Sequence, residues 1–123
     1  MPANLIYQTH PSANCTVYQK RILRELKNYI DAHPETDLTL EEFSCKYNIP
    51  LSSMKKYFRE LYGISIYQYK KNVRMKKAAE LLQETNETVL AIAGAVGYEN
   101  GSKFAAAFRT VMGVAPAEYR RME

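Results

Sequence analysis

Cysteine and histidine, the residues of most metal sites and many catalytic sites, are scarce in this chain of 123 residues. Its two cysteines, Cys15 and Cys45, lie far apart without a C-x-x-C motif, and its two histidines are His10 and His33. This spacing argues against a disulfide framework and against a metal site. A glycine-rich phosphate loop is also missing. We therefore expect no cofactor and no enzymatic activity, and we expect Cys45 to be a small core or boundary residue.

Long hydrophobic runs and alternating patterns are absent as well. The longest apolar run is far shorter than the roughly 20 residues that cross a bilayer, and the first residues do not combine a basic segment with an apolar stretch as secretory signals do. No segment alternates apolar and polar residues as a half-buried strand would. These absences predict an all-α protein in the cytoplasm, without a membrane partner.

Acidic side chains are nearly missing from residues 51–77. This segment contains eight of the chain's seventeen basic residues and a single acid, Glu60. The basic residues of this patch are Lys55, Lys56, Arg59, Lys70, Lys71, Arg74, Lys76 and Lys77. A solvated helical surface would by itself explain such a patch. Clustered positive charge is also what neutralises nucleic-acid phosphates.

What the chain does contain is one block that occurs twice, 50 residues apart: FRELYGISIYQYKK at 58–71 and FRTVMGVAPAEYRR at 108–121. In each copy apolar residues fall at i, i+4, i+7 and i+8, which is one stripe of a helix. The two stripes are Met54, Phe58, Leu61 and Tyr62, and Phe104, Phe108, Val111 and Met112. Gly63 and Gly113 follow, and they predict left-handed caps that end these helices.

A shorter helix precedes each of these helices, matched at an offset of 49: Phe43-Ser44 and Tyr47 pair with Ile92-Ala93 and Val96. Thr39 and Thr88 are the predicted N-caps. Two helices with a tight turn, and a small residue such as Ser44 or Ala93 under their crossing, form a helix-turn-helix.

The complete pattern predicts seven helices, over residues 17–32, 39–47, 51–62, 66–84, 88–96, 101–112 and 116–121. We interpret residues 1–16 as a loose tail, 17–65 as a first helix-turn-helix subdomain, 66–84 as a long connecting helix and 85–123 as a second helix-turn-helix subdomain. The expected fold class is all-α, with two helix-turn-helix subdomains joined by the connecting helix.

From about residue 19 to residue 121 the sequence resembles the DNA-binding domain of AraC/XylS-type transcription regulators. The family's typical residues occur in the second half: Ile92-Ala93, Val96-Gly97-Tyr98, Phe104, Phe108-Arg109, Gly113, Pro116 and Tyr119-Arg120. Arg74 fills the arginine position of the connecting helix. The resemblance implies a bacterial, sequence-specific regulator whose two lobes insert helices into successive major-groove segments on one side of the duplex.

Carried onto these positions, the resemblance implies base readout by two reading helices. The residues expected at base edges are Ser52, Ser53, Lys55 and Lys56 in the first helix and Ser102, Lys103 and Ala106 in the second. The expected phosphate contacts are Arg59, Lys70, Lys71, Arg74 and Arg109. Lys56 would serve a phosphate as well as it serves guanine O6 and N7. Since the family often has long polar side chains where Gly101, Ser102 and Ala106 stand, we expect the first lobe to supply most of the base discrimination.

Two reading helices on one chain predict that a monomer binds double-stranded DNA at a non-palindromic site, with half-sites about 10–10.5 bp apart. Family members often dimerise through a separate sensor domain, for which residues 1–16 are too short. The sequence is compatible with a stand-alone regulator and with a fragment of a longer protein that dimerises. The alternative function is a protein-interaction module that docks RNA polymerase or another regulator through the exposed alanine-rich helix and the acids Glu80, Glu84 and Glu87. RNA binding is less favoured, because the repeated aromatics lie on core stripes and leave no stacking platform.

Overall fold

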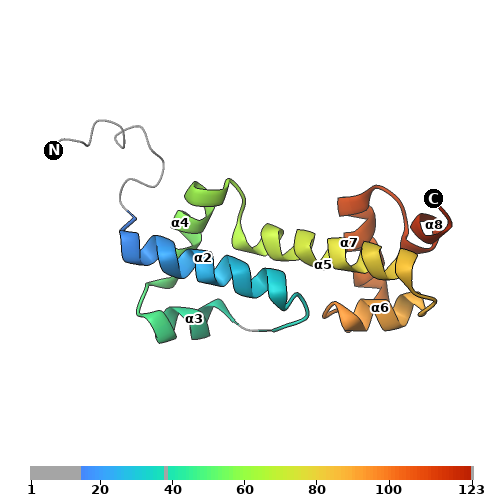
Figure 1. The fold of residues 1–123 in the computed structure, drawn as a ribbon, viewed down its shortest axis with the longest axis horizontal. Helices are drawn as coiled ribbons and strands as arrows, with labels where there is room; N and C mark the ends of the chain where they lie inside the picture. The colour runs from blue at the N-terminus through green and yellow to red at the C-terminus, as the bar shows by residue number, and fades with distance from the viewer. Residues whose placement is uncertain (1–14, 38, 123) are drawn as a thin grey trace. The chain divides into compact units, whose positions relative to one another are not determined.

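The computed structural model describes residues 15–37 and 39–122, which are helical apart from short connections (Figure 1). The helices are α2 (Val17–Ala32), α3 (Leu40–Tyr47), α4 (Leu51–Tyr62), α5 (Ile66–Glu84), α6 (Val89–Ala95), α7 (Gly101–Met112) and α8 (Pro116–Arg121). Within the described residues there is no strand, so the predicted all-α class is confirmed. Nearly all of the predicted N-terminal tail lies outside the described residues. No helix in the described ranges is long and apolar enough to cross a membrane.

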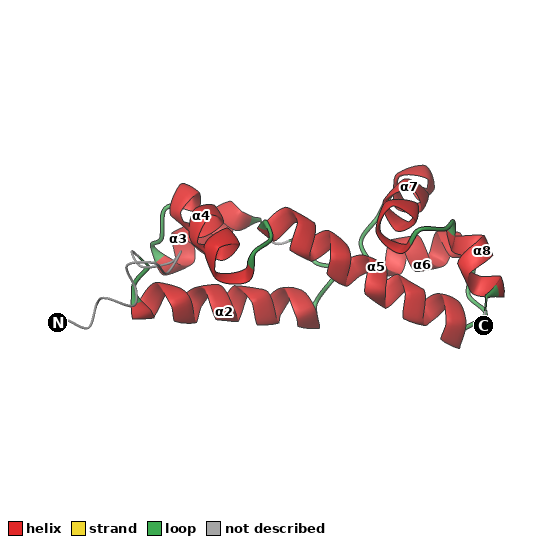
Figure 2. Ribbon diagram, turned by 90° about the horizontal axis from the view of Figure 1, so that it is seen from above, coloured by secondary structure: helices red, strands yellow, loops and turns green. Residues whose placement is uncertain are grey.

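The described residues gather into two compact units. The first unit comprises the residues up to Tyr29 and those between Leu38 and Tyr69, and the second comprises Ile30–Asp37 and the residues from Lys70 onward. In the first unit α3 packs against α4, and in the second unit α7 packs against both α6 and α8. Figure 2 shows α3 and α4 on the same side of α2, and α6 and α7 on the same side of α5. The subdomain limits inferred from the sequence remain a prediction.

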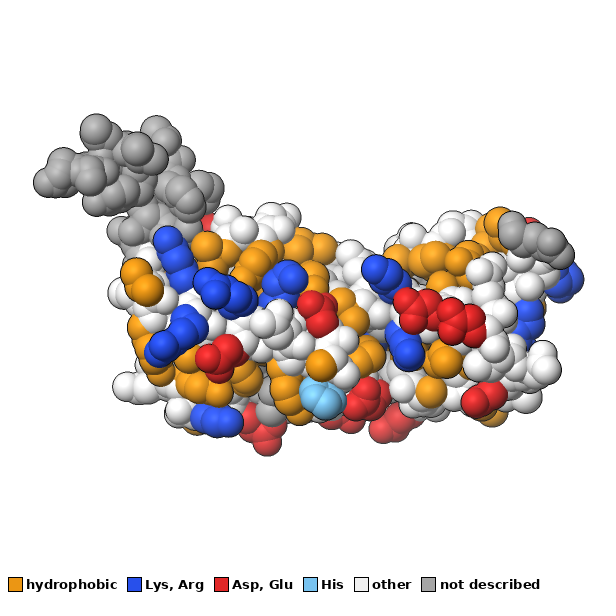
Figure 3. All heavy atoms as spheres, in the orientation of Figure 1, with side chains coloured by type: hydrophobic (Ala, Val, Ile, Leu, Met, Phe, Trp, Pro, Cys, Tyr) orange, Lys and Arg blue, Asp and Glu red, His pale blue; other side chains and the backbone are white. Residues whose placement is uncertain are grey.

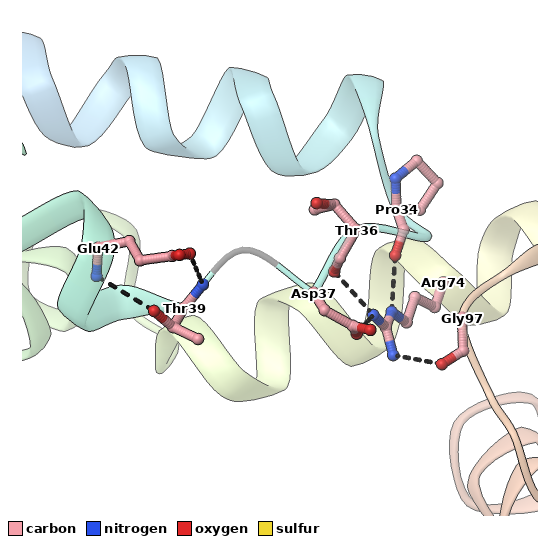
Figure 4. Close-up of polar contacts among 7 residues, drawn as sticks. All are labelled: Pro34, Thr36, Asp37, Thr39, Glu42, Arg74 and Gly97. Carbon is pink, nitrogen blue, oxygen red and sulfur yellow. Dashed lines mark hydrogen bonds and ion pairs between the residues drawn. The ribbon is translucent and has the colours of Figure 1, made fainter.

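Both N-caps predicted for the shorter helices are confirmed. Thr39 and Glu42 form a capping box: the Thr39 hydroxyl accepts from the Glu42 N–H, and the Glu42 carboxylate accepts from the Thr39 N–H, each at 3.1 Å (Figure 4). The Thr88 hydroxyl accepts from the Ala91 N–H at 3.0 Å. Each such cap stabilises its helix by about 1 kcal/mol.

The tight turns of the two copies share a left-handed position and a hydrogen bond, although the segments between the helices differ in length. Asn48 and Gly97 occupy matching positions, and both are left-handed, with φ of 54° and 96°. The next residue then donates its N–H to the carbonyl five residues back, that of Ser44 at 3.1 Å or Ala93 at 2.9 Å. Asparagine tolerates this region better than most residues with a side chain, and glycine enters it freely. The helix-turn-helix is therefore repeated in structure as well as in sequence.

The predicted C-caps of the longer helices are also confirmed. Gly63 and Gly113 are left-handed, with φ of 74° and 89°. Their N–H groups donate to the carbonyls of Arg59 and Arg109, both at 2.8 Å. These caps satisfy carbonyls that the last turn of a helix otherwise leaves unpaired.

The predicted apolar stripes close the core of each unit. Met54 and Phe58 of α4, and Phe104 and Phe108 of α7, are 0% exposed. The core of the second unit comprises Met75, Ala78, Ala79, Leu82, Ile92, Ala93, Val96, Phe104, Ala107 and Phe108. Burial of a large apolar side chain stabilises a fold by about 1.5–3 kcal/mol, so these stripes orient both helices.

Cys45 lies outside the core, so its expected core or boundary position is wrong. It is exposed on α3, whose buried residue is Phe43. Residues two apart on a helix point about 200° away from each other, and the burial of Phe43 therefore turns Cys45 to solvent.

Alanine at Gly97 should destabilise the protein more than alanine at Gly113. Both glycines are left-handed, which costs an L-residue about 1–2 kcal/mol. A Cβ at Gly97 would also lie 2.8 Å from Arg74 Cζ and 3.1 Å from the Glu35 carbonyl oxygen, whereas a Cβ at Gly113 meets no atom within 4 Å. We expect Gly97→Ala to lose a further 1–3 kcal/mol or so of unfolding free energy in urea, because it adds overpacking to the strain. Equal losses in the two variants would contradict the close packing at Gly97.

Candidate nucleic-acid interface

The helix α4 separates a buried apolar face from a polar face open to solvent. The predicted reading and phosphate residues of this helix are exposed or half-buried: Ser52, Ser53, Lys55, Lys56 and Arg59. Positions 52, 55, 56 and 59 follow the i, i+3, i+4, i+7 spacing of one helix face. Met54 and Phe58 hold the opposite face in the core. The fold thus presents two lysines, an arginine and a serine together on a surface that a duplex can approach.

The start of α4 adds backbone donors to this surface. The helix begins after Pro50, and no side chain caps its first turn. N–H groups at a helix start have no partner within the helix, and they carry the positive end of the helix dipole. Such a terminus favours a phosphate.

The corresponding helix of the second unit, α7, has a different exposed face. Its predicted DNA-contacting residues, Ser102, Lys103, Ala106 and Arg109, are all exposed. The Asn100 side chain caps the helix by accepting from the Lys103 N–H at 2.9 Å. The Thr110 hydroxyl donates to the Ala106 carbonyl at 2.9 Å. Because these polar groups bond within the helix, the capacity of the exposed face to bond bases rests on few side chains.

Lys70 and Lys71 are half-buried on α5. Burial lowers the pKa of the Lys70 ammonium group, the positive charge of Arg74 lowers it further, and Asp37 partly offsets both effects. The protonated form of Lys70 is thus held at a cost in the free protein. A phosphate beside it would favour that charged form.

The Arg74 guanidinium is occupied by backbone carbonyls of the second unit (Figure 4). Its Nε donates to the Pro34 carbonyl at 2.6 Å, and its Nη2 donates to the Thr36 carbonyl at 3.0 Å. A longer contact of 3.5 Å joins Nη1 to the Gly97 carbonyl. The guanidinium also lies 5.6 Å from the centroid of the Tyr98 ring, a distance typical of a cation–π contact.

These contacts give Arg74 a structural role. Its side chain is only 12% exposed, and it also lies 3.7 Å from a carboxylate oxygen of Asp37. Hydrogen bonds from a charged donor are among the stronger hydrogen bonds in proteins. The predicted phosphate contact at Arg74 would require the guanidinium to leave these partners, so we do not include Arg74 in the proposed interface.

Arg120 also bonds backbone carbonyls, at the end of α5. The sequence did not predict this role. Its Nε donates to the Leu82 carbonyl at 3.0 Å, and its Nη2 donates to the Thr85 carbonyl at 3.3 Å. The last carbonyls of a helix lack partners within it, so the cation satisfies them and favours the negative end of the dipole. The sequence signals at this position were the family-typical Tyr119-Arg120 and the pairing of Arg120 with Lys70 in the repeat.

Basic side chains also gather over α2, outside the predicted patch (Figure 3). This helix carries Lys20, Arg21, Arg24 and Lys27. Lys20, Arg24 and Lys27 have the i, i+4, i+7 spacing of one helix face, which is the signal that could have found them. They add to the positive charge of the first unit, and hence to its attraction for any polyanion.

The cysteines and acids of the described residues do not form a metal centre. Within residues 15–37 and 39–122 no group of three or more His, Cys, Asp or Glu lies where it could hold a metal ion. Cys15 is buried, and this burial raises the pKa of its thiol, an effect that Lys20 partly offsets. A protonated, buried thiol is unreactive.

Comparison with known proteins places this geometry among DNA-binding regulators. A family model described as a helix-turn-helix domain matches residues 44–122. The chain is 28% identical over 104 residues to the uncharacterized HTH-type transcriptional regulator YisR of Bacillus subtilis, covering 85% of this chain and 36% of that protein. The chain spans about a third of the length of the first curated relatives that it matches.

Solved structures with the same fold include the C-terminal domain of AraT, a response regulator from Geobacillus stearothermophilus. It is 37% identical, with a TM-score of 0.77, over 83% of this chain and 85% of that one. The DNA-binding domain of the global transcriptional factor AdpA, solved in complex with a target DNA, has a TM-score of 0.74 at 24% identity, over 80% of this chain and 88% of that one. At that identity the second likeness shows the fold alone.

Replacing Arg74 with lysine should destabilise the protein although the charge is kept. A lysine ammonium cannot match the fork of donors that reaches Pro34 and Thr36. We expect a loss of about 1.5–3 kcal/mol of unfolding free energy, the range for hydrogen bonds to charged groups. Thermal and urea unfolding would measure it, with Lys71→Arg on the same helix as the control. An Arg74→Lys protein of unchanged stability and reduced DNA affinity would instead assign the residue to phosphate binding.

Proposed function

Because this chain belongs to the AraC-type helix-turn-helix family of transcription regulators, which are DNA-binding proteins and not enzymes, we propose that it binds duplex DNA sequence-specifically through α4 and α7. Each helix would enter the major groove of one half-site, with the two half-sites about one helical turn, 10–10.5 bp, apart. As two reading helices reside on one chain, a monomer would suffice. A longer protein containing this chain could dimerise through further domains.

The proposal rests on a matched pair of helices, α4 and α7. One face of each helix is buried, and the opposite face, its front, is open to solvent. Met54 and Phe58 fill the core behind α4, and Phe104 and Phe108 do so behind α7. The front of each helix is then free for a major groove about 12 Å wide, which admits one α-helix. Basic residues on the front supply the attraction to phosphate that dominates affinity.

The proposed contacts divide into base readout and phosphate binding. We assign base readout to Ser52, Ser53, Lys55, Lys56, Ser102, Lys103 and Ala106, and phosphate binding to Arg59, Lys70, Lys71 and Arg109. The polar front of α4 can donate to several base edges, whereas the front of α7 has fewer donors. The first helix-turn-helix would therefore supply most of the base discrimination.

A second candidate function is docking of a protein partner, such as RNA polymerase, on the second unit. A groove of about 530 Å³ there is lined by apolar side chains that include Val111, Met112 and Tyr119, and by the acids Glu80 and Glu84. A partner helix with an apolar face flanked by basic residues would suit it. Binding by this groove would tolerate salt far better than binding to phosphates does.

The experiment that tests the proposal is selection of binding sites from a randomised duplex pool, followed by titration of the selected site against salt. We expect two enriched blocks about one turn apart. For six to ten phosphate contacts, affinity should fall by roughly 10³–10⁵ between 50 and 200 mM salt. No enrichment, with weak and salt-insensitive binding, would refute the proposal and favour the docking function.

Lys71→Ala should weaken binding to all duplexes by a similar factor. A phosphate contact carries no sequence information, so its loss lowers affinity and reduces the salt slope by about 0.9, with the selected sequence unchanged. Filter binding or anisotropy over a range of salt would measure the slope, with Lys77→Ala on the exposed end of the patch as a comparison. A loss confined to one sequence would show that Lys71 reads a base.

Replacing Lys55 and Lys56 together with alanine should change the sequence preference as well as the affinity. A lysine that donates to guanine discriminates between bases by about 1–3 kcal/mol. Repeating the site selection with the double variant should therefore relax one or two positions of the first block. A consensus identical to that of the unaltered protein would mean that both lysines contact phosphate.

A further inference from the structure

Leu90 is the most exposed large hydrophobic side chain of the second unit, at 68%. It stands in the first turn of α6, beside the start of the reading helix α7. A Cβ placed on Gly101, the first residue of α7, would lie 3.5 Å from Leu90 Cδ1. Because the N-terminal residues of a reading helix are those that contact base edges, Leu90 borders the part of α7 that enters the groove.

Leu90 and the start of α7 form an apolar corner of the surface. The repeat shows that this corner is particular to the second unit. The residue that matches Leu90 in the first unit is Glu41, and the residues that match Ala105 and Ala106 are Lys55 and Lys56. Charged side chains in one copy are thus replaced by apolar side chains in the other. Ala106 is exposed on the front of α7, as Lys56 is on the front of α4.

Two polar side chains of the α7 segment are engaged by the helix itself. Asn100 uses its side-chain oxygen to cap α7, and Thr110 gives its hydroxyl hydrogen to the carbonyl of Ala106. What the corner offers to a base edge is therefore methyl surface. In the major groove only thymine presents a methyl group, and alkyl side chains recognise it by apolar contact.

We propose that Leu90 recognises a thymine by its C5 methyl group in the half-site bound by α7. The inference rests on the proposed DNA-binding function, and it names the chemistry that the second reading surface uses. The first surface would read by charge-assisted hydrogen bonds. The second would add to the contacts of Ser102 and Lys103 the burial of a methyl group, which is neutral and insensitive to salt.

Deoxyuridine lacks the C5 methyl group of thymidine and pairs in the same way, so it isolates the proposed contact. Each thymine of the selected site is replaced singly by deoxyuridine, and the dissociation constant is measured at fixed salt. Removal of one buried methyl group should weaken binding about fourfold at one thymine of the second half-site. We expect no comparable effect in the first half-site.

Three variants connect that methyl group to Leu90. Leu90→Ala should bind the thymidine and deoxyuridine duplexes alike at the sensitive position, because its side chain no longer reaches the methyl group. Leu90→Met, which keeps an apolar side chain of similar size, should retain the discrimination. Glu41→Ala, the matched change in the first unit, should leave it intact.

The possible outcomes distinguish failure of this inference from failure of the proposed DNA-binding function. Sequence-specific, salt-dependent binding with no deoxyuridine effect in the second half-site would overturn the inference and leave the proposed function standing. Full discrimination by the Leu90→Ala protein would overturn the inference in the same way. Absence of salt-dependent binding to any duplex would overturn the proposed function and the inference with it.

Discussion

Burial of Phe58 and Phe108 fixes which side of α4 and which side of α7 faces solvent. Both rings are completely buried, with Met54 and Phe104 one turn earlier. Rotating α4 or α7 about its axis would expose these side chains, at a cost of about 1.5–3 kcal/mol for each. The positions opposite the stripe are therefore held outward as a set. Side chains there can vary between the two copies without disturbing the fold, and they do.

Positive charge has two separate uses in this chain. Arg74 and Arg120 direct their guanidinium groups at backbone carbonyls and stabilise the second unit from within. Lys55, Lys56 and Arg59 remain exposed, where a polyanion can reach them. A count of basic residues therefore overstates the charge available to phosphate, since arginine is well suited to buried carbonyls as well as to phosphates.

The two copies preserve a framework and differ in chemistry. Caps, turns and stripes recur at matching positions, because each is needed to form a helix-turn-helix. The left-handed turn position shows how far substitution can go: Asn48 occupies it in one copy, while Gly97 in the other also makes room for Arg74. Where no packing constraint applies, lysines in α4 become alanines in α7. The exposed faces of the two helices therefore differ in chemistry while the framework behind them is shared.

The sequence by itself determined the helices, their caps and which faces of α4 and α7 are exposed, because these follow from the spacing of apolar residues and from local capping chemistry. Thr39, Gly63 and Gly113 form their capping hydrogen bonds with groups a few residues away, so the local sequence was enough to predict their roles. Tertiary structure alone decided that Arg74 is used internally and that Leu90 lies beside Gly101. Both depend on contacts between residues that are distant in the chain or lie on different helices. The spacing of residues along the sequence does not give the distance between such residues in the fold. The prediction for Cys45 was wrong for a related reason. The apolar pattern of the short helix α3 did not determine which of its faces is buried, and the burial of Phe43 in the folded protein did.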